Sequence, residues 1–214
     1  MNELKDKVKD KVKDKVKNTF VEQKRLYMIL LICMGIGFLV GIVYALVLSK
    51  SDHTLVAESL NHFFTSIKKN DLHYLNGLAN SLVGNVFFVL CLWFFGISII
   101  GMPLIILFLV FQTFLFGFSI SSILYTYHAQ GILRALAYSF PQQWLFLFIA
   151  LFLSFYAVSF SKKLFSYLFL KREVPLKQAM KRYSQVLLIS LVAVVICSFL
   201  EVFLSPIFLR LTLS

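Results

Sequence analysis

Apolar residues run along the chain in long blocks that are separated by shorter polar and basic segments. The longest block, residues 82–124, contains no Lys, Arg, Asp or Glu. As one straight helix it would be about 64 Å long, twice the ~30 Å hydrocarbon thickness of a bilayer. The block therefore predicts two membrane crossings. Gly101 and Pro103 mark the place to fold back, because glycine tolerates turn conformations and proline suits a first helical turn.

Other uncharged blocks predict one more crossing before this pair and two more after it. We therefore expect an all-α protein, a polytopic membrane helix bundle with about five transmembrane helices. The expected spans are residues 26–48, 80–100, 103–124, 144–160 and 186–204.

Two of the polar segments between these spans contain apolar residues at helical spacing. In residues 59–67 the spacing predicts a short helix that lies on the membrane surface. In residues 125–143 it predicts an interfacial or re-entrant helix that ends at Pro141.

The chain begins with a low-complexity repeat, KDKVKDKVKDKVK. We predict a basic cytoplasmic arm, residues 1–25, followed by a single integral membrane domain, residues 26–214. On a helix the repeated valines form a slowly rotating apolar stripe. The arm is then either an amphipathic helix lying on anionic lipids or a solvated tail that only fixes the topology.

Composition agrees with the pattern, because 59% of the residues are apolar and only 14% are charged. Soluble proteins have about 45–50% and ~25%, respectively. The net charge is +11, and the basic residues lie between the apolar spans. This placement indicates a signal for membrane orientation and not a nucleic-acid surface. With five alternating spans and residue 1 inside, 16 of the 21 Lys and Arg face the cytoplasm. We therefore expect a multi-pass protein of the cell membrane with a cytoplasmic N-terminus and an extracytoplasmic C-terminus.

Residues that carry catalytic or metal chemistry are sparse. The sequence contains no GxSxG, HExxH or Walker pattern, and its three cysteines lie singly inside apolar blocks. We predict no enzymatic activity, no cofactor and no metal site. Gln112 and Glu201 are the polar residues expected at membrane depth. Each either bonds a neighbouring helix or lines a polar path, and Glu201 near its helix end can also reach water.

The first span contains the pair Gly37 and Gly41 at small-xxx-small spacing. Such a pair lets another helix backbone approach closely, either within the chain or across a homo-oligomer.

Several further positions, in their order and spacing, resemble the stage II sporulation protein M (SpoIIM) family over residues 26–205. The resemblance lies in amides at the start of the second span, a glycine and a proline between two spans, a Gly-Phe pair, a glycine-led short helix and a Pro-Gln pair. These positions are Asn80, Asn85, Gly101, Pro103, Gly117, Phe118, Gly131, Pro141 and Gln142.

The resemblance implies a polytopic, non-catalytic membrane protein. Proteins of this family help to localise or hold a complex of two peptidoglycan-cleaving proteins during septal thinning and engulfment of the forespore. We accordingly expect a scaffold for peptidoglycan-hydrolase partners, which bind at the outer loops, residues 49–79 and 125–143, and at helix faces. The alternative is a small membrane transporter or channel component that uses Gln112, Asn85 and Glu201 along a polar path.

Overall fold

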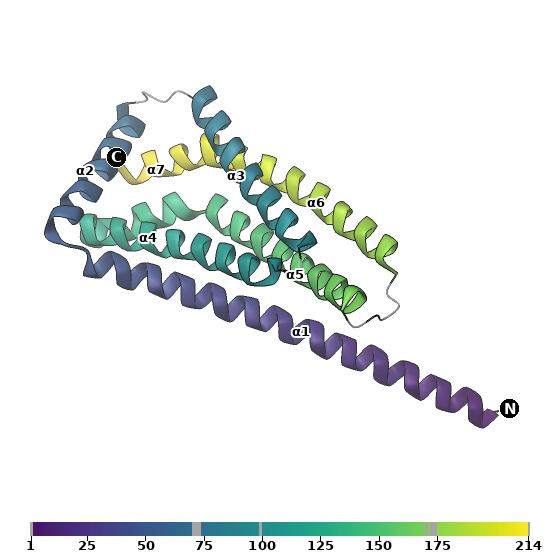
Figure 1. Cartoon of the computed structure of the whole chain (residues 1–214). Helices are drawn as coiled ribbons and strands as arrows, with labels where there is room; N and C mark the ends of the chain where they lie inside the picture. Colours follow the sequence, from purple (N-terminus) through teal and green to yellow (C-terminus); the bar gives the residue numbers. More distant parts are fainter. Residues whose placement is uncertain (1, 70–73, 99, 170, 172–174, 214) are drawn as a thin grey trace.

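Helices of very different lengths follow one another in a computed structural model of the chain (Figure 1). The structure describes the backbone of residues 2–69, 74–98, 100–169, 171 and 175–213, and the side chains among these from residue 21 to 212. No strand occurs in these parts. The elements are α1 Asn2–Val47, α2 Lys50–Lys69, α3 Tyr74–Ile97, α4 Gly101–Ser139, α5 Gln142–Leu168, α6 Leu176–Phe199, the π-helical turn η1 Leu200–Leu204 and α7 Ser205–Leu213.

Five helical stretches in the described residues are long and apolar enough to cross a membrane, as the sequence predicted. They are Val21–Val47, Tyr74–Ile97, Gly101–Ser139, Gln142–Leu168 and Leu176–Thr212. Most of them extend beyond the predicted spans, because prediction stopped each span near charged or amide residues. A helix continues past the hydrocarbon into the interface, where long basic side chains reach water.

α5 is the most buried of the five stretches. α3, α4 and α6 pack around it, and the main hydrophobic core forms where these helices meet. Leu92 of α3, Leu153 of α5 and Val194 of α6 are fully buried in that core. α5 thus occupies the centre of the bundle.

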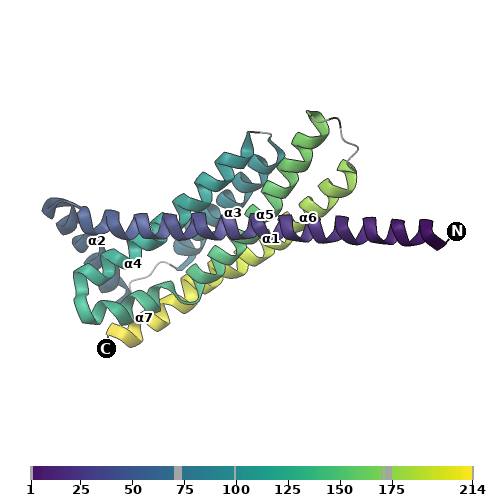
Figure 2. The same ribbon diagram turned by 90° about the horizontal axis from the view of Figure 1, so that it is seen from below.

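α1 lies along α4 and projects beyond the bundle at its N-terminal end, as both views show (Figures 1 and 2). Its backbone is helical from Asn2 without a break at residue 25. The arm and the first span are therefore one continuous helix. The side chains of residues 1–20 lie outside the described residues, so the choice between a lipid-bound and a solvated arm stays open.

The fold-back between α3 and α4 occurs at the predicted place. The backbone N–H of Gly101 donates to Ser98 O at 3.1 Å, and Pro103 lies in the first turn of α4. Gly101 has no positive φ. The position excludes larger residues because a Cβ there would overlap the carbonyl oxygen of Phe95. Close approach is thus the reason for this glycine, and not the unusual backbone angles that the sequence suggested.

α4 is interrupted at His128, whose φ of 48° and ψ of −125° are not helical. Beyond this residue the chain turns back, so that a Cβ on Gly131 would come within 3.0 Å of Leu124 Cα. Residues 129–139 therefore form a short returning helix, which ends before Pro141 as predicted.

The C-terminal region stays helical beyond the predicted end of the fifth span at residue 204. The chain widens into the π-helical turn η1, in which Ser205 N–H donates to Leu200 O, and then continues as α7. Proline has no N–H to bond the residue four positions earlier, and a wider turn accommodates that missing bond.

Candidate functional site

Three segments gather at the end of the bundle opposite the N-terminus (Figures 1 and 2). They are α2, residues 129–139 of α4, and α7, and we call them the end cap. Phe64 and Ile67 of α2, Ala135 of the returning helix and Leu209 of α7 are buried together in one cluster. The apolar face of α2, predicted to lie on the membrane surface, therefore packs largely against protein.

The two segments predicted as separate outer loops are joined to each other. The His53 ring of α2 stacks on Tyr125 of α4, with ring centroids 4.0 Å apart. Two residues after Tyr125, Tyr127 donates from its hydroxyl to Asn61 Oδ1 at 2.6 Å. These contacts connect α2 and the segment around Tyr125 and Tyr127 into a single surface.

Arg134 of the returning helix strengthens the same connection. Its guanidinium carbon lies 4.1 Å from the centroid of the Tyr127 ring and 5.7 Å from that of Phe64. Its Nη2 donates to Gln130 at 3.4 Å. A guanidinium over aromatic faces contributes about 0.5–1 kcal/mol when exposed and more when desolvated. The cap is therefore held by directional contacts as well as by apolar packing.

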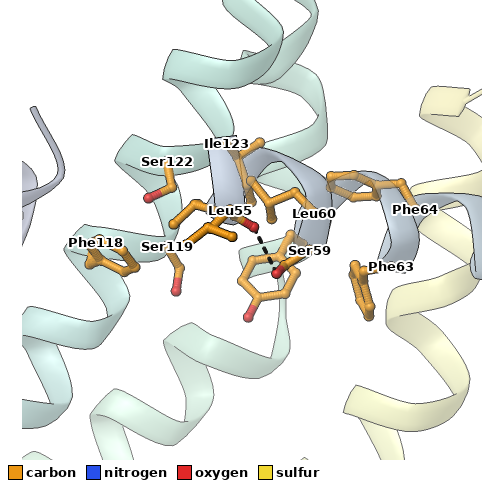
Figure 3. Close-up of a pocket in the computed structure, with 11 residues that line it drawn as sticks. Leu55, Ser59, Leu60, Phe63, Phe64, Phe118, Ser119, Ser122 and Ile123 are labelled. Carbon is orange, nitrogen blue, oxygen red and sulfur yellow. Dashed lines mark hydrogen bonds between the residues drawn. The ribbon is translucent and has the colours of Figure 1, made fainter. Parts of the chain in front are cut away.

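A groove of about 410 Å³ lies between α2 and α4 within the cap. Figure 3 shows that side chains of the two helices line it from both sides. Ser59 donates its hydroxyl to Leu55 O of its own helix at 2.9 Å, so this serine offers the groove little polarity. The remaining lining is mostly apolar, formed by Leu55, Val56, Leu60, Phe63, Phe64, Phe118 and Ile123 with Ser119, Ser122 and Tyr138.

A network of polar side chains joins α3 to the C-terminal region inside the bundle. Ser81 donates to Glu201 Oε2 at 2.5 Å. The Asn85 amide lies 3.1 Å from Ser81 Oγ, 3.1 Å from Ser198 Oγ and 3.3 Å from the same Glu201 oxygen. The four side chains, all partly or fully buried, form one connected network at the end of α6. Glu201 therefore bonds a neighbouring helix.

The sequence pointed to Asn85 and Glu201 but missed Ser81 and Ser198. A signal was present, because Ser81 precedes Asn85 by four residues and Ser198 precedes Glu201 by three. These spacings place each pair on one helical face. Asn80, in contrast, is exposed, and Gln112 of α4 takes no part in this network.

The Gly37 and Gly41 pair lies against α4. A Cβ at Gly37 would come 3.1 Å from Val110 Cα, and one at Gly41 would overlap the carbonyl oxygen of Phe114. From the other side, a Cβ at Gly117 would overlap the carbonyl oxygen of Phe38. Three glycines thus allow the backbones of α1 and α4 to touch. Gly37 and Gly41 therefore serve packing within the chain, which is one of the two roles that the sequence allowed.

The remaining positions of the resemblance lie at helix ends and in the cap. Phe118 lines the groove, and Gly131 contacts the end of the preceding helix segment at the reversal. Pro141 caps the N-terminus of α5. Gln142 is buried, and its carbonyl oxygen accepts the thiol of Cys197 at 3.3 Å. These residues shape the bundle.

Five membrane-length helices and a helical end cap define the chain as a multi-pass α-helical membrane protein. The model of the family Stage II sporulation protein M matches residues 30–206, which is most of the chain. The chain therefore belongs to the SpoIIM family, as the resemblance indicated. No curated protein and no solved structure matches it.

Proposed function

We propose that the protein is a non-catalytic scaffold of the cell membrane, whose end cap binds peptidoglycan-cleaving partner proteins outside the cytoplasm. The observation that carries this proposal is the packing of α2 against both the end of the third crossing and the returning helix, which leaves one surface with an apolar groove. A partner meets an ordered surface there, which lowers the entropy cost of binding. Membership of the SpoIIM family supports a scaffold role at the membrane.

The distribution of charge supports the proposed orientation. The basic residues concentrate in the arm and in residues 161–185, and Lys162 of α5 pairs with Glu22 of α1 at 3.8 Å. This basic end lies opposite the end cap (Figure 1). Since basic segments stay in the cytoplasm, the cap then faces outward.

Co-purification tests the scaffold. Tagged full-length protein is extracted from its native membranes in mild detergent, and bound proteins are assayed for peptidoglycan digestion in a zymogram. We expect hydrolase activity to co-purify, and a solitary protein without such activity contradicts the proposal.

A substitution in the groove tests whether the partner proteins bind there. Leu55 is 59% exposed, so Leu55→Asp puts a charge on the groove with little effect on the core. We expect it to reduce the recovered hydrolase activity strongly. Leu75→Asp is the control, because Leu75 is 83% exposed in the first turn of α3 and does not line the groove. Equal loss in the two variants contradicts docking at the groove.

One observation favours a second candidate, a small transporter or channel component. Asn85 and Glu201 do come together at depth in the bundle, as a polar path requires. Gln112, the third residue of that hypothesis, is not part of their network. Solute flux in proteoliposomes that disappears in Glu201→Gln would favour transport over the scaffold.

A further inference from the structure

The groove between α2 and α4 lies at the membrane boundary on the side of the end cap. α4 begins at Gly101, and Phe118 and Ile123 of the groove follow 17 and 22 residues later. At ~1.5 Å per residue they lie about 26 and 33 Å along the helix, near the ~30 Å at which the hydrocarbon ends. The groove therefore lies where lipids of this leaflet place the junction between acyl chain and headgroup.

The groove is open to a ligand and is mostly apolar. Leu55 and Phe63 line it and are 59% and 41% exposed, so it can be reached from outside the protein. Its volume of about 410 Å³ falls within the ~300–1,000 Å³ that is usual for ligand sites. These properties suit a hydrocarbon chain.

Arg134 brings positive charge to one end of this groove. Its guanidinium carbon lies 5.7 Å from the centroid of the Phe64 ring, and Phe64 lines the groove. Lys68 is exposed one helical turn after Phe64, which adds a second cation along α2. The acidic residues of α2, Asp52 and Glu58, precede Phe64 by twelve and six residues. The charge beside Phe64 is therefore positive.

The guanidinium of Arg134 lacks an anionic partner. Its Nε is buried without a hydrogen-bond partner among the described residues, and its Nη2 reaches Gln130 only at 3.4 Å. The ion pair found in this part of the chain joins Lys162 to Glu22, so no carboxylate pairs with Arg134 there. A partly buried charge is costly unless it is paired. Because Arg134 is partly exposed, an anion can approach it.

These features select the chemistry of the ligand. An apolar chain with an anionic group at one end matches the groove and the cation beside it. The planar guanidinium binds phosphate through two parallel N–H donors, which favours a phosphate head. A phospholipid at the membrane boundary already has this orientation, with its chain directed into the bilayer and its phosphate at the surface.

We propose that the groove and Arg134 form a binding site for an anionic phospholipid of the cap-side leaflet. One acyl chain lies in the groove, and the phosphate accepts hydrogen bonds from the Arg134 guanidinium. A partner protein that docks in the groove displaces this lipid. The site forms without a partner, so the inference goes beyond the scaffold and does not rest on it.

Photolabelling of the purified full-length protein in phosphatidylcholine vesicles tests this site. The probe is phosphatidylglycerol with a diazirine at the end of one acyl chain, and mass spectrometry locates the labelled residues. We expect the groove to be labelled several times more than by phosphatidylcholine that carries the same diazirine. The exposed face of α1, with Leu39 and Val43 at 61% and 57%, is the internal reference and should be labelled equally by both lipids.

Two arginines provide matched variants. Arg134→Gln removes the guanidinium, and we expect phosphatidylglycerol to bind the groove about tenfold more weakly, the loss for a hydrogen bond to a charged group. Arg182→Gln is the control, because it removes the same charge from an exposed position in the basic region and should leave the labelling unchanged. Excess glycerol phosphate should not compete, since it has no acyl chain.

The proposal is overturned if the two lipids label the groove equally, or if neither does, which would favour a protein as the occupant. It is also overturned if glycerol phosphate prevents the labelling, or if the two arginine variants behave alike. Leu55→Asp puts a negative charge on the exposed side of the groove and should lower the labelling as well. Unchanged labelling in this variant contradicts the site even if Arg134→Gln does not fold.

Discussion

The side-chain amide of Asn85 lies 3.3 Å from Glu201 Oε2 and connects residues 116 positions apart in the sequence. Asn85 belongs to α3, and Glu201 lies in the π-helical turn at the end of α6. Their contact ties the second crossing to the fifth. Side-chain hydrogen bonds between membrane helices contribute about 0.6 kcal/mol on average and up to ~1.7.

Asn85→Ala should lower the free energy of unfolding by about 1–2 kcal/mol, near the upper end of that range, because three hydrogen bonds are lost. Equilibrium unfolding in mixed micelles measures the change. Asn80→Ala is the control, since Asn80 is exposed on the same helix and should change stability by less than about 0.5 kcal/mol. If the two variants lose equal stability, the network does not hold α3 in place.

Gly41→Ala should separate α1 from α4, because the new Cβ overlaps the carbonyl oxygen of Phe114. Overpacking of this kind costs about 1–3 kcal/mol, measured as a lower thermal midpoint. Gly35→Ala provides the comparison, since no atom lies within 4 Å of a Cβ there and alanine favours the helix. A midpoint unchanged in Gly41→Ala contradicts the close contact of the two helices.

His128→Gly should stabilise the protein. His128 is exposed and combines a φ of 48° with a ψ of −125°, a backbone conformation that glycine adopts freely and that costs another residue about 1–3 kcal/mol. Glycine removes this cost, offset in part by its own entropy. His62→Gly, at an exposed position inside α2, should instead lose about 1 kcal/mol. Opposite shifts of the thermal midpoint are thus expected from the same substitution.

A reporter that is active only outside the cytoplasm should be active when fused after Ser214. The same reporter fused before Met1 should be inactive, because an odd number of crossings puts the termini on opposite sides. The five stretches fix the parity, and the basic arm sets the direction. A cytosolic C-terminus contradicts the outward-facing end cap, and the scaffold proposal with it.

Much of the fold follows from local features of the sequence. Uncharged blocks long enough to cross a bilayer leave backbone groups no partner except their own helix, so span number and helix type are decided locally. The fold-back at Gly101 and the helix end before Pro141 follow from local chain chemistry in the same way. For this reason five crossings and the returning helix were predictable.

Which side chains contact one another was harder to predict from the sequence. Asn80 and Asn85 look alike in the sequence, yet only Asn85 meets Glu201, because five residues on a helix turn the side chain to another face. Gln112 was grouped with Glu201 by polarity alone, and polarity does not tell which helices are neighbours. The sequence also gave no reason to join the His53 segment to the Tyr125 segment.

The sequence by itself determined that the chain is a five-span membrane protein of the SpoIIM family with its basic residues gathered toward one end. It did so because lipid solvation acts on each segment separately. Only the tertiary structure decided that Ser81, Asn85, Ser198 and Glu201 form one network and that α2 and the returning helix pack into one cap. Those contacts depend on how distant helices pack and turn, which no single segment encodes.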